Sequence, residues 1–391
     1  MKTKNLLMAF LAGGLALASC NQTPKVPEGE FLIEGELKNV PDSLVIKLLK
    51  EEGKVVRPIA IDTVTQGKFE FRGFINNLES QKFLLSCNDD GFPGTWADVW
   101  VKSGSYTKIM GEDRLLPLWK ISSEVPEQQT VNEIIKLCYK ERKSVMRLQA
   151  QEYDMFRSVG EHALDRHKVD SLRKLRAPLD SLIYLTEINY LKEIPVTKVW
   201  LDKYKLYSSF LHWNTQFGHQ KLIRSLYARM SEAEKTTELG EEITGYINLP
   251  KKLSVGDDMV DGDLYDLDGK VRHLSEFKGK YILLDFWSQG CGPCMQTLSE
   301  VDLITQQYNG RMEVVSINLD SKELWMDFIA KKGLKGNQWN ELRKGFTGLA
   351  AAYQVISIPH YVMISPEGKV IAMWSGYAQG SLKEKMKELI K

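Results

Sequence analysis

The sequence predicts a multidomain protein with an N-terminal antiparallel β-sandwich or barrel, a central α-helical region and a C-terminal α/β domain. Short strand-like segments with alternating apolar residues fill residues 30–113, and apolar residues recur at helical spacing in residues 124–247. Two strongly apolar strand-like segments then alternate with helical patterns in residues 253–391. A chain of 391 residues is long enough for two or three domains.

The first twenty residues are typical of a secretory signal. Two lysines precede a short apolar segment, residues 6–17, which is shorter than the roughly 20 residues needed to span a bilayer. The motif LASC that ends at Cys20 resembles a bacterial lipobox, whose cysteine is acylated. We therefore expect residues 1–20 to be a lipoprotein signal peptide with Cys20 as the lipid anchor, and residues 21–29 to be a tether. An ordinary signal peptide cut nearby is the alternative.

Residues 30–113 are expected to form the β domain. Phe31, Ile33 and Leu37 share one face of a strand, and Phe69 and Phe71 repeat the alternation after a turn. Gly, Pro, Asn and Asp separate such strands at intervals of about 8–12 residues, which favours a sandwich or a barrel.

Residues 114–248 are expected to form a helical domain. One apolar stripe includes Leu172, Leu179 and Ile183, and Pro178 and Pro195 are expected to bound or kink helices. Aromatic residues between positions 204 and 217 are interpreted as core, with a partner-docking surface as the alternative.

Residues 253–391 have the pattern of an α/β domain. We expect an opening hairpin within residues 263–274, followed by central parallel strands at residues 281–287 and 312–319. A helix that begins at a serine cap is expected over residues 321–332.

The turn after the first central strand carries two cysteines, Cys291 and Cys294, separated by Gly292 and Pro293. Paired thiols at the start of a helix can close and reopen a disulfide, because the helix N-terminus favours a thiolate. Half of a zinc site and a purely structural disulfide are the alternatives. Zinc needs about four ligands and no second ligand pair is evident, and so short a loop constrains the unfolded chain little.

The C-terminal domain resembles the thioredoxin superfamily, and within it the membrane-tethered TlpA/ResA-like thiol-disulfide oxidoreductases. The resemblance rests on the CGPC motif, on Asp285 six residues before Cys291, on Trp287, and on Ile358-Pro359 before a strand. It implies that Cys291 is the nucleophile, Cys294 the resolving cysteine and Asp285 a proton shuttle.

The resemblance also implies that five residues contact the substrate. Three lie around the cysteines, Trp287, Gly292 and Pro293, and two are expected to form a cis peptide bond, Ile358 and Pro359. A helix inserted after the second central strand is typical of the TlpA/ResA-like group. The segment before the helices resembles the β domain of unknown function that precedes thioredoxin-like domains in Bacteroides-group lipoproteins.

Three of these residues have simpler interpretations. Asp285 could be an ordinary acid at a strand end, although an acid within an apolar strand is expected to be buried, with a raised pKa. Trp287 could be plain core, and Pro359 could be trans, as most X-Pro bonds are.

The chain also departs from the family pattern. Gly290 replaces the tryptophan that usually precedes the first cysteine, Thr297 replaces the group's glutamate, and Ser316 stands about where thioredoxins have a lysine near the buried acid. No role of that glutamate is carried over, and the tuning of Asp285 is left open. His360 could lie near the sulfurs or be a strand-edge histidine.

Charge and cysteine usage limit the partners. The net charge of +1 gives no reason to expect nucleic acid, and no cofactor or metal is expected. Cys87 and Cys138 are expected to be buried, inert thiols, with a disulfide between them as the alternative.

The sequence therefore predicts a periplasm-facing lipoprotein that reduces disulfides of exported proteins. The resemblance implies that a membrane electron donor of the thiol-relay type recharges it. A disulfide oxidase or isomerase, and a redox-sensing binding or scaffold lipoprotein, are the alternatives.

Overall fold

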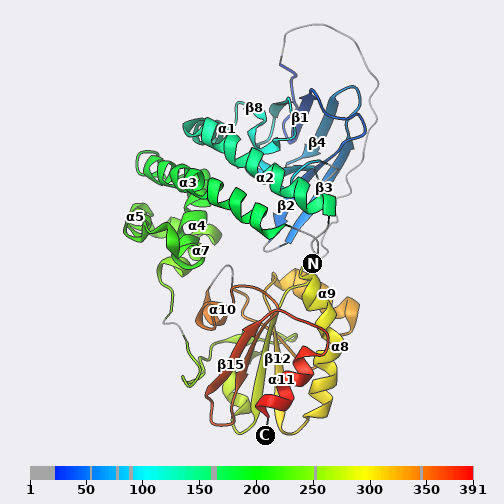
Figure 1. The fold of residues 1–391 in the computed structure, drawn as a ribbon, viewed down its shortest axis with the longest axis vertical. Helices are drawn as coiled ribbons and strands as arrows, with labels where there is room; N and C mark the ends of the chain where they lie inside the picture. The colour runs from blue at the N-terminus through cyan, green and yellow to red at the C-terminus, as the bar shows by residue number, and fades with distance from the viewer. Residues whose placement is uncertain are drawn as a thin grey trace. The chain divides into compact units, whose positions relative to one another are not determined.

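The computed structural model describes residues 23–52, 55–75, 79–87, 91–159, 165–250, 253–343 and 347–390 (Figure 1). These residues form two compact units. One comprises the described residues up to 51 together with 57–193 and 197–199, and the other comprises 52–56, 194–196 and the described residues from 200 onwards.

The N-terminal strands form two four-stranded sheets. The first has the order β4 (Lys68–Phe74), β1 (Glu30–Leu37), β7 (Ser105–Gly111), β8 (Lys120–Ser123), and the second has the order β3 (Val55–Thr63), β2 (Val45–Glu52), β5 (Gln81–Cys87), β6 (Trp96–Val101). Buried side chains of both sheets, such as Ile33 of β1 and Leu85 of β5, belong to one hydrophobic core. The structure therefore confirms the expected sandwich.

Two details of this sandwich differ from the expectation. The pair β1–β7 is parallel, whereas β1–β4, β7–β8, β2–β5 and β5–β6 are antiparallel. Strand β8 lies beyond residue 113, where the β domain was expected to end. It extends the first sheet because Ile121 pairs with Ile109 and both side chains enter the core.

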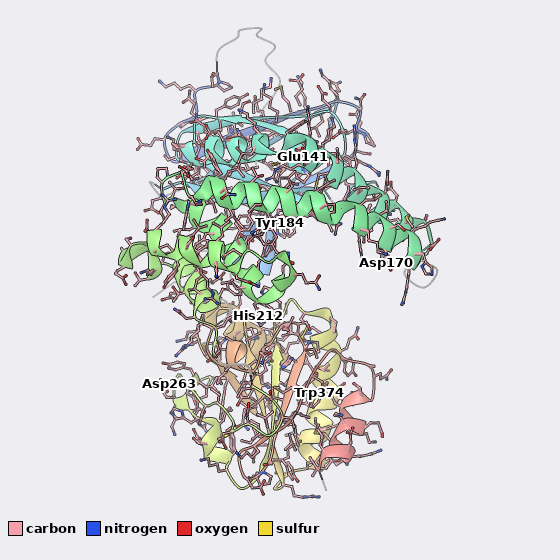
Figure 2. All side chains as sticks on the ribbon, turned by 60° about the vertical axis from the view of Figure 1, so that its left-hand side comes forward. Glu141, Asp170, Tyr184, His212, Asp263 and Trp374 are labelled. Carbon is pink, nitrogen blue, oxygen red and sulfur yellow. A yellow bond between two sulfur atoms is a disulfide. The ribbon has the colours of Figure 1, made fainter. Side chains whose placement is uncertain are left out.

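Three helices follow the sandwich in the first unit: α1 (Pro126–Leu137), α2 (Tyr139–Val159) and α3 (Arg166–Leu191). Helix α3 continues through Pro178, and Pro195 lies after its end, as expected for a helix breaker. Val145 of α2 and Ile183 of α3 share a buried cluster against which Tyr184 packs (Figure 2). An ion pair between Arg142 and Glu187 also joins α2 to α3.

Four described α-helices precede the C-terminal sheet and lie in the second unit from residue 200 onwards: α4 (Lys198–Trp213), α5 (Gln220–Leu226), α6 (Glu232–Lys235) and α7 (Glu238–Ile247). Tyr204 and Tyr207 are buried, and the Tyr204 hydroxyl donates a hydrogen bond to the backbone oxygen of Ile223 over 2.8 Å. These aromatic residues are core, as expected, while Trp213 at the end of α4 is 40% exposed.

The C-terminal residues form a seven-stranded mixed sheet. Its order is β10 (Val271–Arg272), β9 (Leu264–Tyr265), β13 (Asn337–Asn340), β12 (Met312–Asn318), β11 (Tyr281–Trp287), β14 (His360–Ile364), β15 (Val370–Ser375). The neighbours β11 and β12 are parallel, as expected, and β12–β13 is parallel too. The expected hairpin is the antiparallel pair β9–β10.

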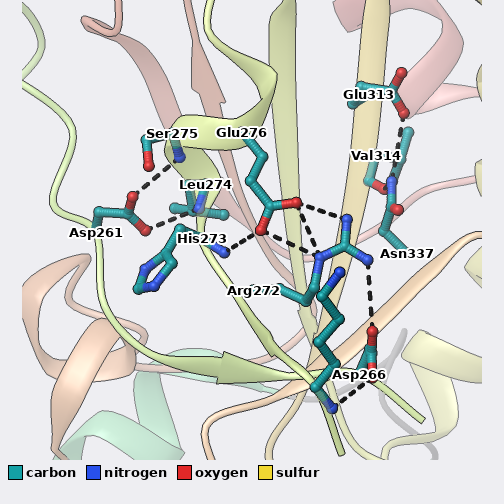
Figure 3. Close-up of polar contacts among 11 residues, drawn as sticks. Asp261, Asp266, Arg272, His273, Leu274, Ser275, Glu276, Glu313, Val314 and Asn337 are labelled. Carbon is teal, nitrogen blue, oxygen red and sulfur yellow. Dashed lines mark hydrogen bonds and ion pairs between the residues drawn. The ribbon is translucent and has the colours of Figure 1, made fainter. Parts of the chain in front are cut away.

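Polar contacts hold the connection from this hairpin into β11 (Figure 3). Asp261 accepts hydrogen bonds from the backbone N–H groups of Leu274 and Ser275 at the start of a short 3-10 helix, Leu274–Phe277. Arg272 pairs with Glu276 and Asp266, and its guanidinium lies over the ring of Trp339. These contacts fix the hairpin β9–β10, which forms one edge of the sheet next to β13.

Helices cover both faces of the sheet. Helix α8 (Gly292–Gln307) and α11 (Ser381–Leu389) pack on the face that carries Leu283, and α10 (Gly348–Ala352) packs on the face that carries Phe286. Helix α9 (Lys322–Lys332) begins at the Ser321 cap, as expected for the inserted helix. Because side chains alternate along β11, its residues supply cores on both faces and the strand is buried along its length.

Candidate active site

The turn between β11 and α8 carries the paired thiols. Cys291 is the N-cap residue of α8, and its sulfur accepts a hydrogen bond from the backbone N–H of Cys294 over 3.1 Å. Pro293 lies in the first turn of the helix, where a missing N–H costs nothing. The positive end of the helix dipole therefore lies at Cys291 Sγ and favours its thiolate when the sulfur is reduced.

Cys291 and Cys294 are joined by a disulfide, with their Cα atoms 5.2 Å apart. Their accessibility differs, because Cys294 is 0% exposed while Cys291 is only partly buried. An incoming disulfide can therefore meet Cys291, whereas Cys294 can react only from inside the protein. This asymmetry fits a nucleophile at Cys291 and a resolving thiol at Cys294.

The loop that precedes β14, the neighbour of β11 in the sheet, approaches the same sulfur. Cys291 Sγ lies 3.5 Å from the backbone carbonyl oxygen of Ile358, and the Ile358–Pro359 peptide bond is cis. Gly292 and Pro293 are exposed beside the sulfur, and Ile358 is partly buried. Four of the five residues expected to contact a substrate thus lie in this turn and this loop, and of these four only Pro359 is buried.

The fifth residue, Trp287, lies beneath the disulfide. It is 1% exposed, shares a buried cluster with Cys294 and Trp325, and has its ring 5.5 Å from that of Phe328. A side chain with so little exposed surface packs the site from below. The burial of Trp287 favours its interpretation as core, and substrate contact by this side chain stays a prediction.

Asp285 is buried on the same face of the sheet as α8. It lies between Leu283, which packs with Val301 of α8, and Trp287, which packs with Cys294, and alternate residues of a strand share a face. Only 2% of its surface is exposed. Burial raises the pKa of Asp285 to about 7, because a desolvated carboxylate is disfavoured, while the hydrogen bond from Ser316 acts in the opposite direction.

The neighbours of Asp285 on the adjacent strands are polar but uncharged in the neutral pH range. Ser316 of β12 donates to Asp285 Oδ2 over 3.4 Å, and Tyr361 of β14 is the residue opposite Asp285 in the sheet. Asp285 Oδ1 has no hydrogen-bond partner within the part of the chain that the structure describes. Ser316 therefore stands beside the acid, as expected of the position where thioredoxins have lysine, and supplies a hydroxyl in place of a cation.

His360 points away from the disulfide. It pairs with Phe286, which packs on the face opposite α8, and its Nδ1 lies 2.7 Å from the hydroxyl oxygen of Ser375. Burial lowers the pKa of His360 to about 4, so this ring is neutral at physiological pH. The alternative that placed it near the sulfurs is wrong.

Sequence reasoning missed a buried polar network beside the first cysteine. Asp320, just beyond β12, accepts hydrogen bonds from Ser288 and from the backbone N–H of Gln289, two residues of the turn that leads to Cys291. Polar residues at the carboxyl ends of adjacent parallel strands were the available signal, because those ends meet at one edge of a sheet.

The two other cysteines that the structure describes lie outside this site. Cys87 and Cys138 are buried thiols, as expected. Among the described residues, no group of three or more His, Cys, Asp or Glu is placed to hold a metal ion.

The leader falls outside the residues that the structure describes, and with it the expected signal peptide and Cys20. Among the helices that are described, none is both long enough and apolar enough to span a membrane.

Comparison with known proteins matches the C-terminal domain. A thioredoxin-like family model matches residues 279–370. The thiol-disulfide oxidoreductase ResA of Bacillus subtilis is 30% identical over 146 residues, which are 36% of this chain and 78% of the relative. ResA of Bacillus cereus is 28% identical over 149 residues, which are 38% of this chain and 83% of the relative.

Solved structures are similar to about a third of the chain. A thiol-disulfide oxidoreductase from Bacteroides fragilis is 26% identical, with a TM-score of 0.32, and the match covers 34% of this chain and all of that one.

Proposed function

The chain belongs to the thioredoxin-like family of thiol-disulfide oxidoreductases, and from this premise we propose that it reduces disulfide bonds of exported proteins through Cys291 and Cys294. One observation carries the proposal. A partly exposed sulfur at the N-terminus of a helix is bonded to a fully buried sulfur, and a buried carboxyl group with a pKa of about 7 lies on the same face of the sheet.

The first step is attack by the reduced enzyme on a substrate disulfide. The Cys291 thiolate displaces one substrate sulfur, so that a mixed disulfide forms between Cys291 and the substrate, and the displaced thiolate takes up a proton. The N–H of Cys294, 3.1 Å from Cys291 Sγ, stabilises the thiolate before it reacts. Half-burial of Cys291 restricts this step to substrates whose disulfide can approach the rim formed by Gly292, Pro293 and Ile358.

The second step releases the reduced substrate. The Cys294 thiol gives its proton to Asp285, directly or through water, and the resulting thiolate attacks Cys291 Sγ. The bond between Cys291 and the substrate breaks, the second substrate sulfur leaves as a thiolate and is protonated, and the Cys291–Cys294 disulfide forms. Two electrons have then passed from the enzyme to the substrate. Because the pKa of Asp285 is about 7, its carboxyl group can both accept this proton and return it near neutral pH.

Pro359 and Ile358 supply the contact that orients the substrate in this proposal. The carbonyl oxygen of Ile358 lies 3.5 Å from Cys291 Sγ, at the edge where an extended segment can pair with the backbone. Backbone pairing selects an extended conformation and not a particular sequence, so the enzyme would accept disulfides in unfolded or flexible segments.

The oxidised enzyme has to be recharged. A membrane electron donor with its own dithiol would reduce the Cys291–Cys294 disulfide by the same exchange chemistry. Three features of residues 1–20 support a lipoprotein that is anchored at Cys20 and faces the periplasm. They are two lysines, an apolar segment and a lipobox. Cys20 would then be acylated and take no part in thiol exchange.

The test compares insulin reduction by the full chain with two variants. Wild type is expected to reduce insulin with dithiothreitol as electron source, and Cys291→Ser to be inactive. Cys294→Ser, reduced beforehand and then freed of dithiothreitol, is expected to accumulate as a mixed disulfide with insulin, because the sulfur that breaks the intermediate is absent. Recovery of the Cys294→Ser protein without bound substrate would contradict the scheme. Wild type that shuffles scrambled ribonuclease but reduces no insulin would favour an oxidase or isomerase.

A further inference from the structure

Four polar side chains are buried together at the carboxyl ends of three neighbouring strands. Ser288 follows β11, Asn318 ends β12, Asp320 lies two residues further along the chain, and Asn340 ends β13. Their exposed fractions are 4%, 1%, 4% and 2%. Burial of this many polar groups costs free energy unless each is hydrogen-bonded, and all four side chains make hydrogen bonds.

The hydrogen bonds converge on Asp320. Its Oδ1 accepts from the Ser288 hydroxyl over 2.6 Å, and its Oδ2 accepts from Asn318 Nδ2 over 3.1 Å. Its backbone N–H donates to Asn318 Oδ1 over 2.8 Å, and its backbone oxygen accepts from Asn340 Nδ2 over 2.9 Å. Asp320 is therefore fixed from β12 and β13 at once.

The same carboxylate holds the turn that leads to the reactive sulfur. Asp320 Oδ2 accepts from the backbone N–H of Gln289 over 2.8 Å, and the Ser288 hydroxyl accepts from the N–H of Gly290 over 3.3 Å. The Ser288 carbonyl oxygen accepts from the N–H of Cys291 over 3.1 Å. Three consecutive peptide N–H groups of this turn are thus bound by Asp320 or by the serine that Asp320 fixes.

We propose that Asp320 is a positioning residue for Cys291, because its carboxylate fixes the 288–290 turn and so keeps Cys291 Sγ at the N-terminus of α8. The turn ends in Gly290, which has no side chain to pack against the domain, and hydrogen bonds to its backbone N–H groups help to hold it in place. The inference rests on the proposed function, since it assigns a supporting residue to the attacking sulfur.

The decisive variants are Asp320→Asn and Ser288→Ala in the full-length protein. Asparagine keeps the size of the side chain but turns one acceptor into a donor, which then faces donors of Ser288, Gln289 or Asn318. Ser288→Ala removes the hydroxyl that links Asp320 to Gly290 without a change of charge. Both variants are expected to slow the attack of reduced Cys291 on the small disulfide 5,5′-dithiobis(2-nitrobenzoate) by about 10- to 100-fold, the loss typical of a misplaced reacting group.

A second readout separates positioning from stability. The pH dependence of Cys291 alkylation by iodoacetamide reports the fraction of thiolate, and in Ser288→Ala it is expected to move to higher pH, because the sulfur is held less firmly against the N–H of Cys294. Asp261→Asn is the matched control. Asp261 also accepts backbone N–H groups, from Leu274 and Ser275, but it does so at the short 3-10 helix Leu274–Phe277 that precedes β11 (Figure 3). It should lower the melting temperature without altering either reaction of Cys291.

Wild-type rates and a wild-type alkylation profile in both Asp320→Asn and Ser288→Ala would overturn the proposal, even if both variants melt earlier. Should Asp320→Asn fail to fold, Ser288→Ala decides the matter alone, because it removes one bond of the network and no charge. The alkylation profile needs no protein substrate. A failure of wild type to reduce insulin would therefore contradict the proposed function and leave this test of Asp320 intact.

Discussion

Asp285→Asn should make the protein more stable and less active, and the burial of Asp285 sets the size of both effects. A rise in the pKa from its ordinary value of 3.8 to about 7 corresponds to roughly 4 kcal/mol, at about 1.4 kcal/mol for each tenfold change in the ionisation constant. This free energy is the cost of holding the ionised carboxylate in the folded domain. An asparagine of nearly the same shape does not incur it.

The direction of the pH dependence follows from the raised pKa. Below pH 4 the carboxyl is protonated in both the folded and the unfolded protein, and ionisation costs nothing. Between about pH 4 and pH 7 the unfolded chain loses this proton while the folded protein keeps it, so the stability of the wild type falls as the pH rises. Above pH 7 the full cost is present. Asp285→Asn should therefore be stabilised relative to wild type at pH 8, by up to about 4 kcal/mol, and not at pH 4.

The same burial makes Asp285 a useful proton acceptor. Transfer of a thiol proton to a carboxylate with a pKa of about 7 is less unfavourable by roughly 4 kcal/mol than transfer to an ordinary aspartate, whose pKa is 3.8. Loss of this acceptor should slow the second step of the reaction by about 10²- to 10⁴-fold, the usual contribution of a general base.

Calorimetry of the reduced protein at pH 4 and pH 8 measures the first effect, and it can separate the transition of the C-terminal domain from other transitions. Decay of a preformed mixed disulfide in single turnover measures the second. Asp302→Asn, on the exposed side of α8, is the control and should change neither quantity. Equal destabilisation by Asp285→Asn at both pH values, with an unaltered decay rate, would refute the reasoning.

Three further predictions concern packing and metal. Trp287→Ala should lower the free energy of unfolding by about 3–5 kcal/mol, because a buried ring beneath the disulfide is lost, and urea titration of the reduced protein measures this; a loss below about 1 kcal/mol would contradict the packing role. Glu300→Ala should cost about 0.5–2 kcal/mol in the same titration, since Glu300 accepts the backbone N–H groups of Gly380 and Lys383 at the start of α11; an unchanged midpoint would contradict this cap. Treatment with EDTA should leave insulin reduction unchanged, and a loss restored by added zinc would revive the zinc alternative.

The local parts of the site were predictable from the sequence. The spacing of Cys291 and Cys294 after an apolar strand placed both at a helix N-terminus, and an acid inside that strand indicated a buried carboxyl group. The structure has both features, because each depends on residues near one another in the chain.

The long-range parts were not predictable in the same way. The hydrogen bond between Ser288 and Asp320 joins residues 32 positions apart. It forms because the parallel neighbours β11 and β12 have their carboxyl ends side by side. The parallel pairing of β1 with β7 likewise could not be predicted. Alternation of apolar residues along a strand marks the face that is buried, but it does not say which strand lies next to it. For Trp287 the sequence left both substrate contact and plain core open, because the motif fixes its position in the sequence but not its depth.

The equilibrium potential of the Cys291/Cys294 couple, measured against glutathione in the full-length protein, tests the central claim most directly. A disulfide reductase should have a potential near the thioredoxin end of the known range, about −270 mV. A value near −120 mV would make the protein an oxidant, and the absence of any disulfide between these two cysteines at equilibrium would contradict the redox assignment itself.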